Sequence, residues 1–374
     1  MDMKKSILSL SLLTLLTNPL FASTQEGEDA YNQQRYEKAY ILLVDEAAKG
    51  DPKAQFLLGK MYYSAQGVAF NAEKTEQLLL ASANQGNVDA QALLAGFYWN
   101  LNTPEGFTKA RTWYEKAAAQ NNPSAQYGLG YIYSHGNGVP VNYDTAISWY
   151  KKAAEQGNSD ASLSIGYLYD TGKIGPKNMP EAISWYTKSA DAGNAIAQYN
   201  LGLIYGYGDA GTKDYTKAHA YFLKSAEQGN ADSQLELGYL YDGGKGVPAD
   251  LQKAAGWYQK SADQGNAEAA YNVGDMYLYG DGLTKNLEQS LAWVRKSAEK
   301  GYAQAQNRLG IFYRDGIGVS ADPVEAYAWF TVAEANGYKD ATKNRTELEK
   351  TLTPAQLIQA QELGTSYTSK YPKK

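Results

Sequence analysis

Cysteine is absent from this chain of 374 residues, and histidine occurs only as His135 and His219. Without thiols the protein cannot form disulfides, cysteine nucleophiles or cysteine-rich zinc sites. The two histidines lie in different segments, so we expect no paired-histidine metal site and predict neither a metal nor a cofactor. The fold must therefore be stabilised by packing.

The chain has no excess of basic charge, because it contains 35 Lys and Arg residues and 40 Asp and Glu residues, for a net charge of −5. A nucleic-acid-binding protein normally carries a basic stripe, so nucleic acid is not a predicted partner. After the N-terminal region no apolar run approaches the roughly 20 residues that span a bilayer. The chain is rich instead in tyrosine and glycine, with 32 and 36 residues.

The N-terminal 22 residues have the order of a secretory signal. Lys4 and Lys5 precede an apolar run that ends at Phe21, and the small residues Ala22 and Ser23 follow. No cysteine follows this point, which excludes a lipoprotein anchor. We therefore predict a signal peptide over 1–22 that is cleaved near Ala22. The mature protein is then expected to be periplasmic or secreted, without insertion into a membrane.

One segment of the sequence occurs twice in nearly identical form, as AISWYKKAAEQGN at 146–158 and as AISWYTKSADAGN at 182–194. A catalytic motif has no reason to recur, whereas a unit that buries its apolar face against a copy of itself does. A second pattern, A-Q-x-x-L-G-x-x-Y, recurs in steps of 35 or 36 residues. Its copies begin at Ala54, Ala90, Ala125, Ala161, Ala197, Ser233, Ala269 and Ala305.

The first helical pattern of each copy places its repeated residues on one face. In the third copy these residues are Ala125, Leu129, Gly130 and Tyr133, whose spacing fits a 3.6-residue period. A glycine inside a helix costs roughly 0.5–1 kcal/mol relative to alanine, so its recurrence needs a compensating gain. We expect that gain to be a close approach of two helix backbones.

The second helical pattern carries an aromatic pair, such as Trp149-Tyr150, and ends at a glycine such as Gly157. A left-handed residue commonly closes a helix, and Asn121, which replaces the glycine in one copy, tolerates that conformation. Helix–turn–helix units of this length stack on their neighbours. The sequence thus predicts an all-α fold, a right-handed α-solenoid of about eight 36-residue repeats over 51–337.

The two ends of the repeated region are expected to be capped. Residues 23–50 are predicted to form N-terminal capping helices, and residues 338–374 to form C-terminal capping helices. Within the second segment, Thr353 is followed by Pro354 and Gln356, an order that predicts a capping box at the start of a helix.

The combined pattern A-x-x-x-L-G-x-x-Y … G-x-G-V … A-x-x-W-Y-x-K-A-A-x-x-G-N resembles the Sel-one-like repeat (SLR) family, a relative of the tetratricopeptide repeats. The resemblance covers roughly residues 36–340, and the loops at 100–107 and 172–179 depart from the pattern. It implies an adaptor, not an enzyme, that binds another protein in a concave groove lined by the first helices. The partner would be a bacterial effector or envelope protein, or a host protein, and we expect a monomer.

When the eight copies are aligned, positions whose residue varies between copies are free to contact such a partner. Positions whose residue recurs are expected to serve the stacking of one repeat on the next. Three variable columns lie two, six and nine residues after the first alanine of each copy, which places them on one stripe of the helix. Tyrosine suits recognition because it offers a large, stiff contact area with a polar tip. The alternative is that some of these rings pack between neighbouring repeats instead of facing the groove. The candidate partner-binding residues are Tyr63, Trp99, Tyr127, Tyr131, Tyr167, Asp170, Tyr199, Tyr239, Asp242, Tyr271 and Asp275.

Two hypotheses about the partner rest on analogy with the resembled family. One is a periplasmic immunity protein that neutralises a type VI secretion phospholipase effector. The alternative is a secreted binder of host factors of the immunoglobulin A type. The cap residues that resemble such a binder are Asn344-Arg345, Leu352-Thr353, Gln359 and Gln361.

A third hypothesis, a weak β-lactam hydrolase, rests on Ser148 and Lys151, which match a Ser-x-x-Lys motif. The sister copy has Thr187 in place of the lysine, and the partner motifs Ser-Asp-Asn and Lys-Thr-Gly are absent. We therefore predict no catalytic residue.

Overall fold

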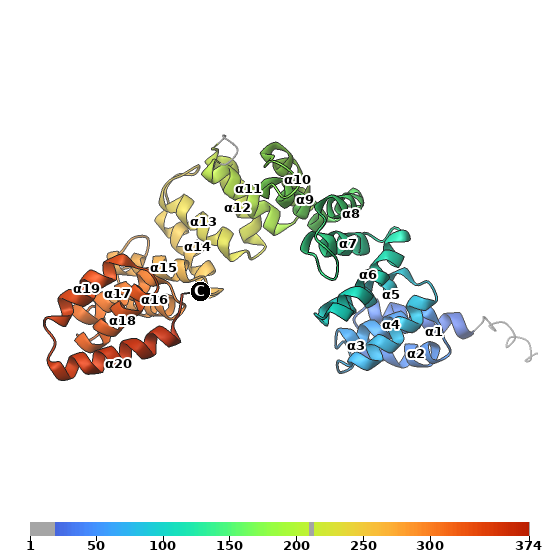
Figure 1. Cartoon of the computed structure of the whole chain (residues 1–374), viewed down its shortest axis with the longest axis horizontal. Helices are drawn as coiled ribbons and strands as arrows, with labels where there is room; N and C mark the ends of the chain where they lie inside the picture. The colour runs from blue at the N-terminus through green and yellow to red at the C-terminus, as the bar shows by residue number, and fades with distance from the viewer. Residues whose placement is uncertain (1–18, 209–212, 374) are drawn as a thin grey trace, which may run out of the picture. The chain divides into compact units, whose positions relative to one another are not determined.

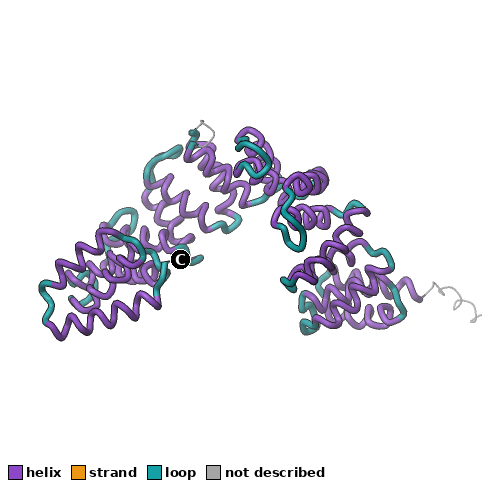
Figure 2. The backbone as a smooth tube through the Cα atoms, in the orientation of Figure 1, coloured by secondary structure: helices purple, strands orange, loops and turns teal. Residues whose placement is uncertain are grey.

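The structure, a computed structural model, describes residues 19–208 and 213–373, and every regular element within them is an α-helix (Figures 1 and 2). The predicted all-α solenoid of helix–turn–helix repeats is confirmed. Residues 1–18 of the predicted signal peptide lie outside the described residues. The chain divides into two compact units, Met1–Pro176 and Lys177–Lys374.

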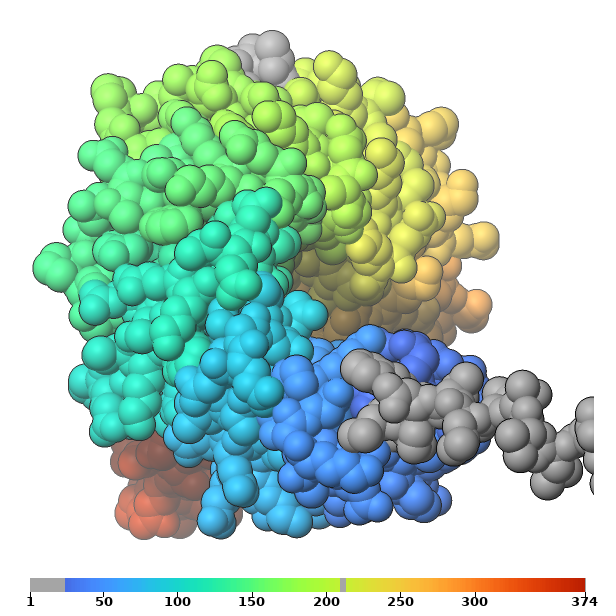
Figure 3. All heavy atoms as spheres, turned by 90° about the vertical axis from the view of Figure 1, so that its right-hand side faces the viewer, coloured from blue at the N-terminus to red at the C-terminus, as the bar shows by residue number. Residues whose placement is uncertain are grey.

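The first unit is a stack of helical hairpins in which each helix packs on the next one along the chain. Figure 3 follows this order on the surface, where the colour advances from blue through teal to green. Its helices are α1 (Pro19–Asn32), α2 (Tyr36–Ala48), α3 (Pro52–Tyr63), α4 (Ala72–Asn84), α5 (Val88–Asn100), α6 (Pro104–Ala119), α7 (Pro123–His135), α8 (Tyr143–Glu155) and α9 (Ser159–Thr171).

The second unit continues the same hairpin pattern and ends in a pair of helices outside it. Its helices are α10 (Met179–Asp191), α11 (Ala195–Tyr207), α12 (Tyr215–Glu227), α13 (Ala231–Asp242), α14 (Leu251–Asp263), α15 (Ala267–Tyr279), α16 (Leu287–Glu299), α17 (Ala303–Asp315), α18 (Pro323–Ala335), α19 (Lys339–Glu349) and α20 (Pro354–Lys370). The odd-numbered helices from α3 to α17 are called first helices below, and their even-numbered partners second helices. None of the helices described between residues 19 and 373 is long and apolar enough to cross a lipid bilayer.

A Gly-Asn pair lies at five of the junctions between hairpins and has two roles. Gly157 adopts a left-handed conformation, with φ of 85°, just after α8. Asn158 then caps α9, because its side-chain oxygen accepts a hydrogen bond from the backbone N–H of Ala161 at 2.8 Å. Asn121 takes the left-handed conformation after α6, with φ of 64°, as the sequence predicts.

At Gly130 and Gly202 the recurring glycine of the first helix makes room for a side chain rather than for a second backbone. A Cβ atom added to Gly130 would lie 2.5 Å from the ring of Tyr150, and one added to Gly202 would lie 2.5 Å from the ring of Phe222. The expected close approach of two backbones is therefore wrong at these positions. Each glycine accepts an aromatic ring of its own second helix, and these rings are at most 2% exposed.

The N-terminal hairpin uses the same geometry with a leucine in place of the aromatic ring. A Cβ atom added to Gly27 in α1 would lie 2.6 Å from Leu43 in α2, as one added to Gly59 would approach Leu79. At the other end, α20 begins with the expected capping box of Thr353 and Gln356. It packs on α18 through rings, the tightest of which are Trp329 and Tyr367, whose centroids are 4.9 Å apart.

Candidate partner-binding site

The predicted partner-binding residues all lie on first helices, and none of them is fully buried. Tyr167 is 54% exposed and Asp242 is exposed. The other nine are half-buried, which leaves part of each side chain in contact with solvent. The surface formed by these residues and their neighbours on the first helices is called the first-helix face of each unit. The half-buried residues are Tyr63, Trp99, Tyr127, Tyr131, Asp170, Tyr199, Tyr239, Tyr271 and Asp275.

Tyrosines on the first-helix face of the second unit are fixed by hydrogen bonds to the following repeat. The Tyr207 hydroxyl donates to both carboxylate oxygens of Glu236, at 3.0 and 3.1 Å. The Tyr239 hydroxyl donates to Glu268 at 2.7 Å and accepts from Asn272 at 3.3 Å. Because each bond joins two successive first helices, these rings are held in place before any partner arrives.

Arg308 of α17 makes three such hydrogen bonds to α15. Its guanidinium donates to the hydroxyls of Tyr271 at 2.8 Å and Tyr279 at 3.0 Å, and to the Asp275 carboxylate at 3.3 Å. Burial opposes the charge on Arg308, but the Tyr271 hydrogen bond and the Asp275 charge outweigh it and raise the pKa of the guanidinium. Burial raises the pKa of Asp275, and the charge of Arg308 only partly offsets this effect.

Negative charge accumulates on the same face. Burial raises the pKa of the Glu236 carboxyl, and the nearby charges of Glu268 and Asp232 add to the rise. The Tyr207 hydrogen bond and the charge of Lys245 oppose it. The face therefore combines stiff aromatic rings with carboxylates that are crowded together.

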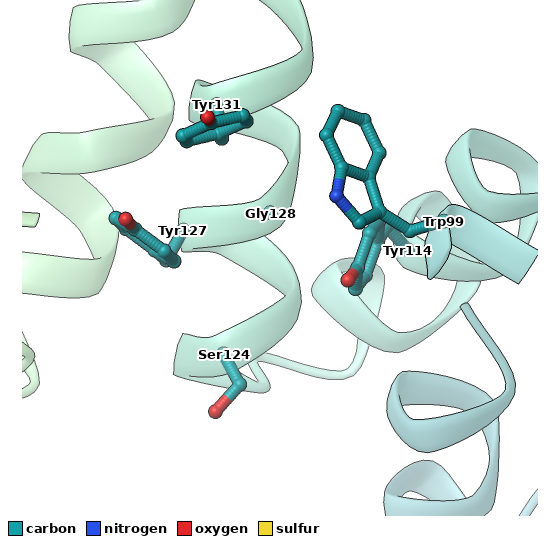
Figure 4. Close-up of a pocket in the computed structure, with 6 residues that line it drawn as sticks. All are labelled: Trp99, Tyr114, Ser124, Tyr127, Gly128 and Tyr131. Carbon is teal, nitrogen blue, oxygen red and sulfur yellow. The ribbon is translucent and has the colours of Figure 1, made fainter. Parts of the chain in front are cut away.

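The first-helix face of the first unit contains a pocket of about 240 Å³. Figure 4 shows Trp99 and Tyr114 on one side of it, facing Tyr127 and Tyr131 of α7 across Gly128. The ring centroids of Trp99 and Tyr131 are 5.4 Å apart with the rings perpendicular. The lining residues are Trp99, Tyr114, Ser124, Tyr127, Gly128 and Tyr131.

The pocket exists because one second-helix ring does not enter its own hairpin. Ala95 stands where other first helices have the recurring glycine, so its methyl group occupies the space that a ring would take. Tyr114, the counterpart of the buried Tyr150, stays half-buried, and Trp113 packs in the core instead. The Tyr114 ring reaches Gly128 of the next repeat, where an added Cβ atom would lie 2.8 Å from it.

Two tyrosines of the pocket, Tyr114 and Tyr127, have raised pKa values. Burial raises the pKa of Tyr114 to about 12. Burial and then the charge of Asp160 raise the pKa of Tyr127. Their hydroxyls can therefore both donate and accept hydrogen bonds, beside the hydroxyl of the exposed Ser124.

The Ser-x-x-Lys pair noted in the sequence lies at the surface of the first unit. Ser148 and Lys151 lie one turn apart on α8 and are both exposed. Within residues 19–208 and 213–373, no group of three or more His, Asp or Glu side chains is arranged to hold a metal ion. The arrangement is suited to contact with another molecule through rings, hydroxyls and carboxylates.

Several residues of this face were missed by the sequence prediction. Tyr114 is not among the predicted residues, although Ala95 signals a difference in that copy. Gly128, Glu236 and Arg308 share a column, three residues after the first alanine of the repeat, that was not considered. Its residues vary between copies as strongly as those of the predicted stripe, and this variation was the available signal.

Comparisons with known proteins agree with this architecture. Over nearly its whole length, the chain is similar to the solved structure of a protective antigen of uropathogenic Escherichia coli that displays an SLR fold. The two are 33% identical, with a TM-score of 0.60, over 94% of this chain and 84% of that chain. A Sel1 repeat protein from Oxalobacter formigenes is 30% identical, with a TM-score of 0.64, over 93% of this chain and 98% of that one.

A curated relative matches over a much shorter stretch. An uncharacterized protein of Neisseria meningitidis is 32% identical over 108 residues, which are 29% of this chain and 22% of that protein. The chain thus spans about a fifth of the length of this relative.

The Sel1 repeat pattern itself matches eight times in succession and covers most of the chain. The matched residues are 52–87, 88–122, 123–158, 159–194, 195–230, 231–266, 267–302 and 303–338. Proteins built from such repeats act as protein-interaction scaffolds. The chain belongs to the Sel1 repeat family.

Proposed function

We propose that the protein is an exported scaffold that binds another protein on its first-helix face. The observation that carries the proposal is the set of tyrosines held by hydrogen bonds between successive first helices, such as the exposed Tyr207 with Glu236 and the half-buried Tyr239 with Glu268. Rings that are fixed before binding lose little conformational entropy when a partner arrives. Tyrosine is also enriched at protein–protein interfaces.

The compartment belongs to the same proposal. The order of residues 1–22 favours export, so the partner would be met in the periplasm or outside the cell. In the periplasm, the partner would be an effector that the protein neutralises, as an immunity protein does, or an envelope protein.

A host factor is the second candidate partner. The observation in its favour is the 33% identity to a protein described as a protective antigen of uropathogenic Escherichia coli. A protein that the host encounters in this way can also contact host molecules, and an immunoglobulin is then the first ligand to test.

The experiment is an affinity capture with residues 23–374 from the envelope extract of the source cell. A parallel capture uses the variant Tyr131→Ala, Tyr167→Ala, Tyr239→Ala. The matched control is Ile41→Ala with Phe70→Ala, because these side chains are 70% and 59% exposed and lie off the first-helix face. We expect one protein to be retained by the wild type and the control and to be lost by the tyrosine variant.

Other outcomes separate the candidates. Retention by the wild type and by both variants would place the binding surface elsewhere and contradict the proposal. Capture of immunoglobulin from serum, together with failure to capture any bacterial protein, would favour the host-factor candidate. If the retained protein is toxic to the cell and expression of this chain protects against it, the immunity hypothesis is supported.

A further inference from the structure

Carboxylates are concentrated on α13 and α15, two successive first helices of the second unit (Figure 1). Neither helix contains a lysine or an arginine. Among the described residues, only Asp275 of this set forms an ion pair, with Arg308 at 3.3 Å. The acidic residues of the two helices are Asp232, Glu236, Asp242, Glu268 and Asp275.

Neutral groups hold two of the remaining carboxylates in place. Glu236 accepts hydrogen bonds from the Tyr207 hydroxyl, and Glu268 accepts one from the Tyr239 hydroxyl. A neutral donor fixes a carboxylate but leaves its charge uncompensated. Burial and the charges of nearby carboxylates raise the pKa of Glu236, and the charge of Lys245 only partly opposes them. A cation brought by a partner would relieve this repulsion.

The exposed ring of Tyr207 adds a second attraction for a cation. Elsewhere in the second unit, lysines of the chain lie over tyrosine rings, as Lys217 does over Tyr205 at 5.2 Å and Lys253 over Tyr241 at 5.4 Å. In the described part of the chain no cation covers Tyr207, which is 61% exposed. Its hydroxyl donates to a carboxylate, and this makes the face of the ring more negative. Such a face attracts an ammonium or guanidinium group.

A buried hydroxyl beside the same carboxylates is left without a partner. In the first unit, Ser134 shares a hydrogen bond of 3.0 Å with the Tyr150 hydroxyl. Asp242 and Tyr258 stand at the corresponding positions, but the hydroxyl of Tyr258, a side chain that is 2% exposed, has no hydrogen-bond partner among the described residues. Burial and then the charge of Asp242 raise the pKa of Tyr258, so its hydroxyl lies beside the acidic cluster. The exposed Asp242 carboxylate thus forgoes an internal contact and stays available to an external one.

The name acidic face is used below for the surface formed by Tyr207, Asp232, Glu236, Tyr239, Asp242 and Glu268. We propose that the acidic face binds a basic segment of the partner protein, with one lysine or arginine over the Tyr207 ring beside Glu236 and another at Glu268. This inference rests on the proposed scaffold function and names the chemistry of the partner. Opposite charges on two surfaces speed their association and favour one partner over others. A metal ion is not the expected cation, because no three acidic side chains of the described residues are arranged to hold one.

The test is a titration of fluorescein-labelled basic peptides with the full-length chain, followed by fluorescence anisotropy. Tetralysine and tetra-arginine are the probes, and tetralysine with every side chain acetylated is the control without positive charge. We expect saturable binding of at least one basic peptide and no saturable binding of the acetylated peptide. Failure of both basic peptides to bind, or equal binding of the acetylated peptide, would overturn the proposal.

Two variants with the same net charge separate the site from the overall charge of the protein. Glu236→Gln with Glu268→Gln removes two charges and keeps an acceptor oxygen for each tyrosine hydroxyl. Glu227→Gln with Glu299→Gln removes two exposed charges at the ends of the second helices α12 and α16. We expect the first pair to weaken binding at least about fivefold and the second pair less than about twofold. Equal weakening by both pairs would overturn the proposal.

The contact with the ring is tested separately. Tyr207→Leu removes the ring and leaves the Glu236 charge, so binding should weaken about two- to fivefold. Tyr279→Leu is the matched control, because Tyr279 is also exposed but its hydroxyl accepts from Arg308 and lies outside the acidic face. Binding by Tyr207→Leu that equals wild-type binding would contradict the placement of a cation over this ring.

The peptide titration fails independently of the affinity capture. If a captured partner is retained equally by the wild type and by Glu236→Gln with Glu268→Gln, the acidic-face inference is wrong and the scaffold function stands. If a basic peptide binds as expected while no partner protein is captured, the chemistry of the acidic face stands and the scaffold function is contradicted.

Discussion

Gln228, at the end of α12, donates a hydrogen bond of 2.7 Å to the side-chain oxygen of Gln198, near the start of α11. The amide group of Gln198 in turn donates to the carbonyl oxygen of Ala190 in the preceding second helix, at 3.1 Å. One buried side chain therefore joins two successive hairpins. The same amide pair occurs in six repeats, as Gln55–Gln85, Gln91–Gln120, Gln126–Gln156, Gln198–Gln228, Gln234–Gln264 and Gln306–Asn336.

The first prediction is that the amide pair acts as a unit. Gln198→Ala removes two hydrogen bonds, one to the Ala190 carbonyl and one from the Gln228 amide, so we expect a loss of about 1–3 kcal/mol in the free energy of unfolding. Gln228→Ala should cost less, because Gln228 is exposed. The double variant should cost about 0.5–1 kcal/mol less than the sum of the single variants, as measured by urea denaturation.

Two repeats of the chain support this expectation. They carry Ser162 with Ala192 and Ala270 with Lys300 at the paired positions, so both amides are replaced together. Additive losses in the denaturation experiment would contradict the coupling.

The second prediction concerns the recurring glycine. Gly130→Ala places a methyl group 2.5 Å from the buried Tyr150 ring, so we expect a loss of about 1–3 kcal/mol despite the higher helix propensity of alanine. The matched control is Gly256→Ala, inside α14, where an added Cβ atom has no neighbour within 4 Å. This variant should gain up to about 1 kcal/mol. Thermal unfolding of both proteins checks the prediction, and a stabilised Gly130→Ala would contradict it.

The fold could be predicted because its signals are local and recur. A residue with a left-handed backbone, a glycine or Asn121, marks the junctions between hairpins, and an Asn or Asp side chain caps the next helix at most of them. The group that packs against Gly130 was harder to predict, because a glycine indicates only that another part of the chain lies close to its Cα atom. Whether a backbone or the Tyr150 ring fills the space depends on the angle between two helices, which the period does not give.

The candidate site could be predicted only in part for a related reason. Tyr127 and Tyr239 were selected as candidates only because the residues at their positions vary between repeats. The pocket depends on the single methyl group of Ala95, which keeps Tyr114 out of its hairpin, and on Gly128 in the next repeat. Contacts between repeats depend on how far one first helix is shifted along its neighbour, and no single copy contains that information.

The third prediction is a pH dependence of stability that originates at Glu236. Burial and the charges of Glu268 and Asp232 raise the pKa of this carboxyl in the folded state. A carboxyl with a raised folded pKa contributes stability below its unfolded pKa, near 4.5, and loses it as the pH rises through the folded value. Glu236→Gln should therefore stabilise the protein at pH 7 and have little effect near pH 4.

The control for this prediction is Glu227→Gln, whose carboxylate is exposed at the end of α12. Its midpoint of thermal unfolding should follow that of the wild type across the same pH range. A Glu236→Gln variant whose midpoint falls at pH 7 would show that the hydrogen bond accepted from Tyr207 outweighs the crowding of charge.

The fourth prediction is that removal of Arg308 is costly and that the cost depends on pH. Arg308→Ala leaves the Tyr271 and Tyr279 hydroxyls without their donor and Asp275 without its counter-charge, so we expect a loss of about 1–3 kcal/mol at pH 7. The pKa of Asp275 is already raised by burial, and the loss of the cation raises it further. Below that pKa the carboxyl is neutral, so the deficit should shrink as the pH falls toward 4.

Asp275→Asn separates the two causes of this loss. Combined with Arg308→Ala, it removes the unpaired charge but not the unpaired hydroxyls, so the double variant should recover part of the stability at pH 7 and none near pH 4. A deficit of Arg308→Ala that is equal at both pH values would mean that the hydroxyl contacts carry the whole effect. Arg308 would then be held in place by the hydroxyls of Tyr271 and Tyr279 alone.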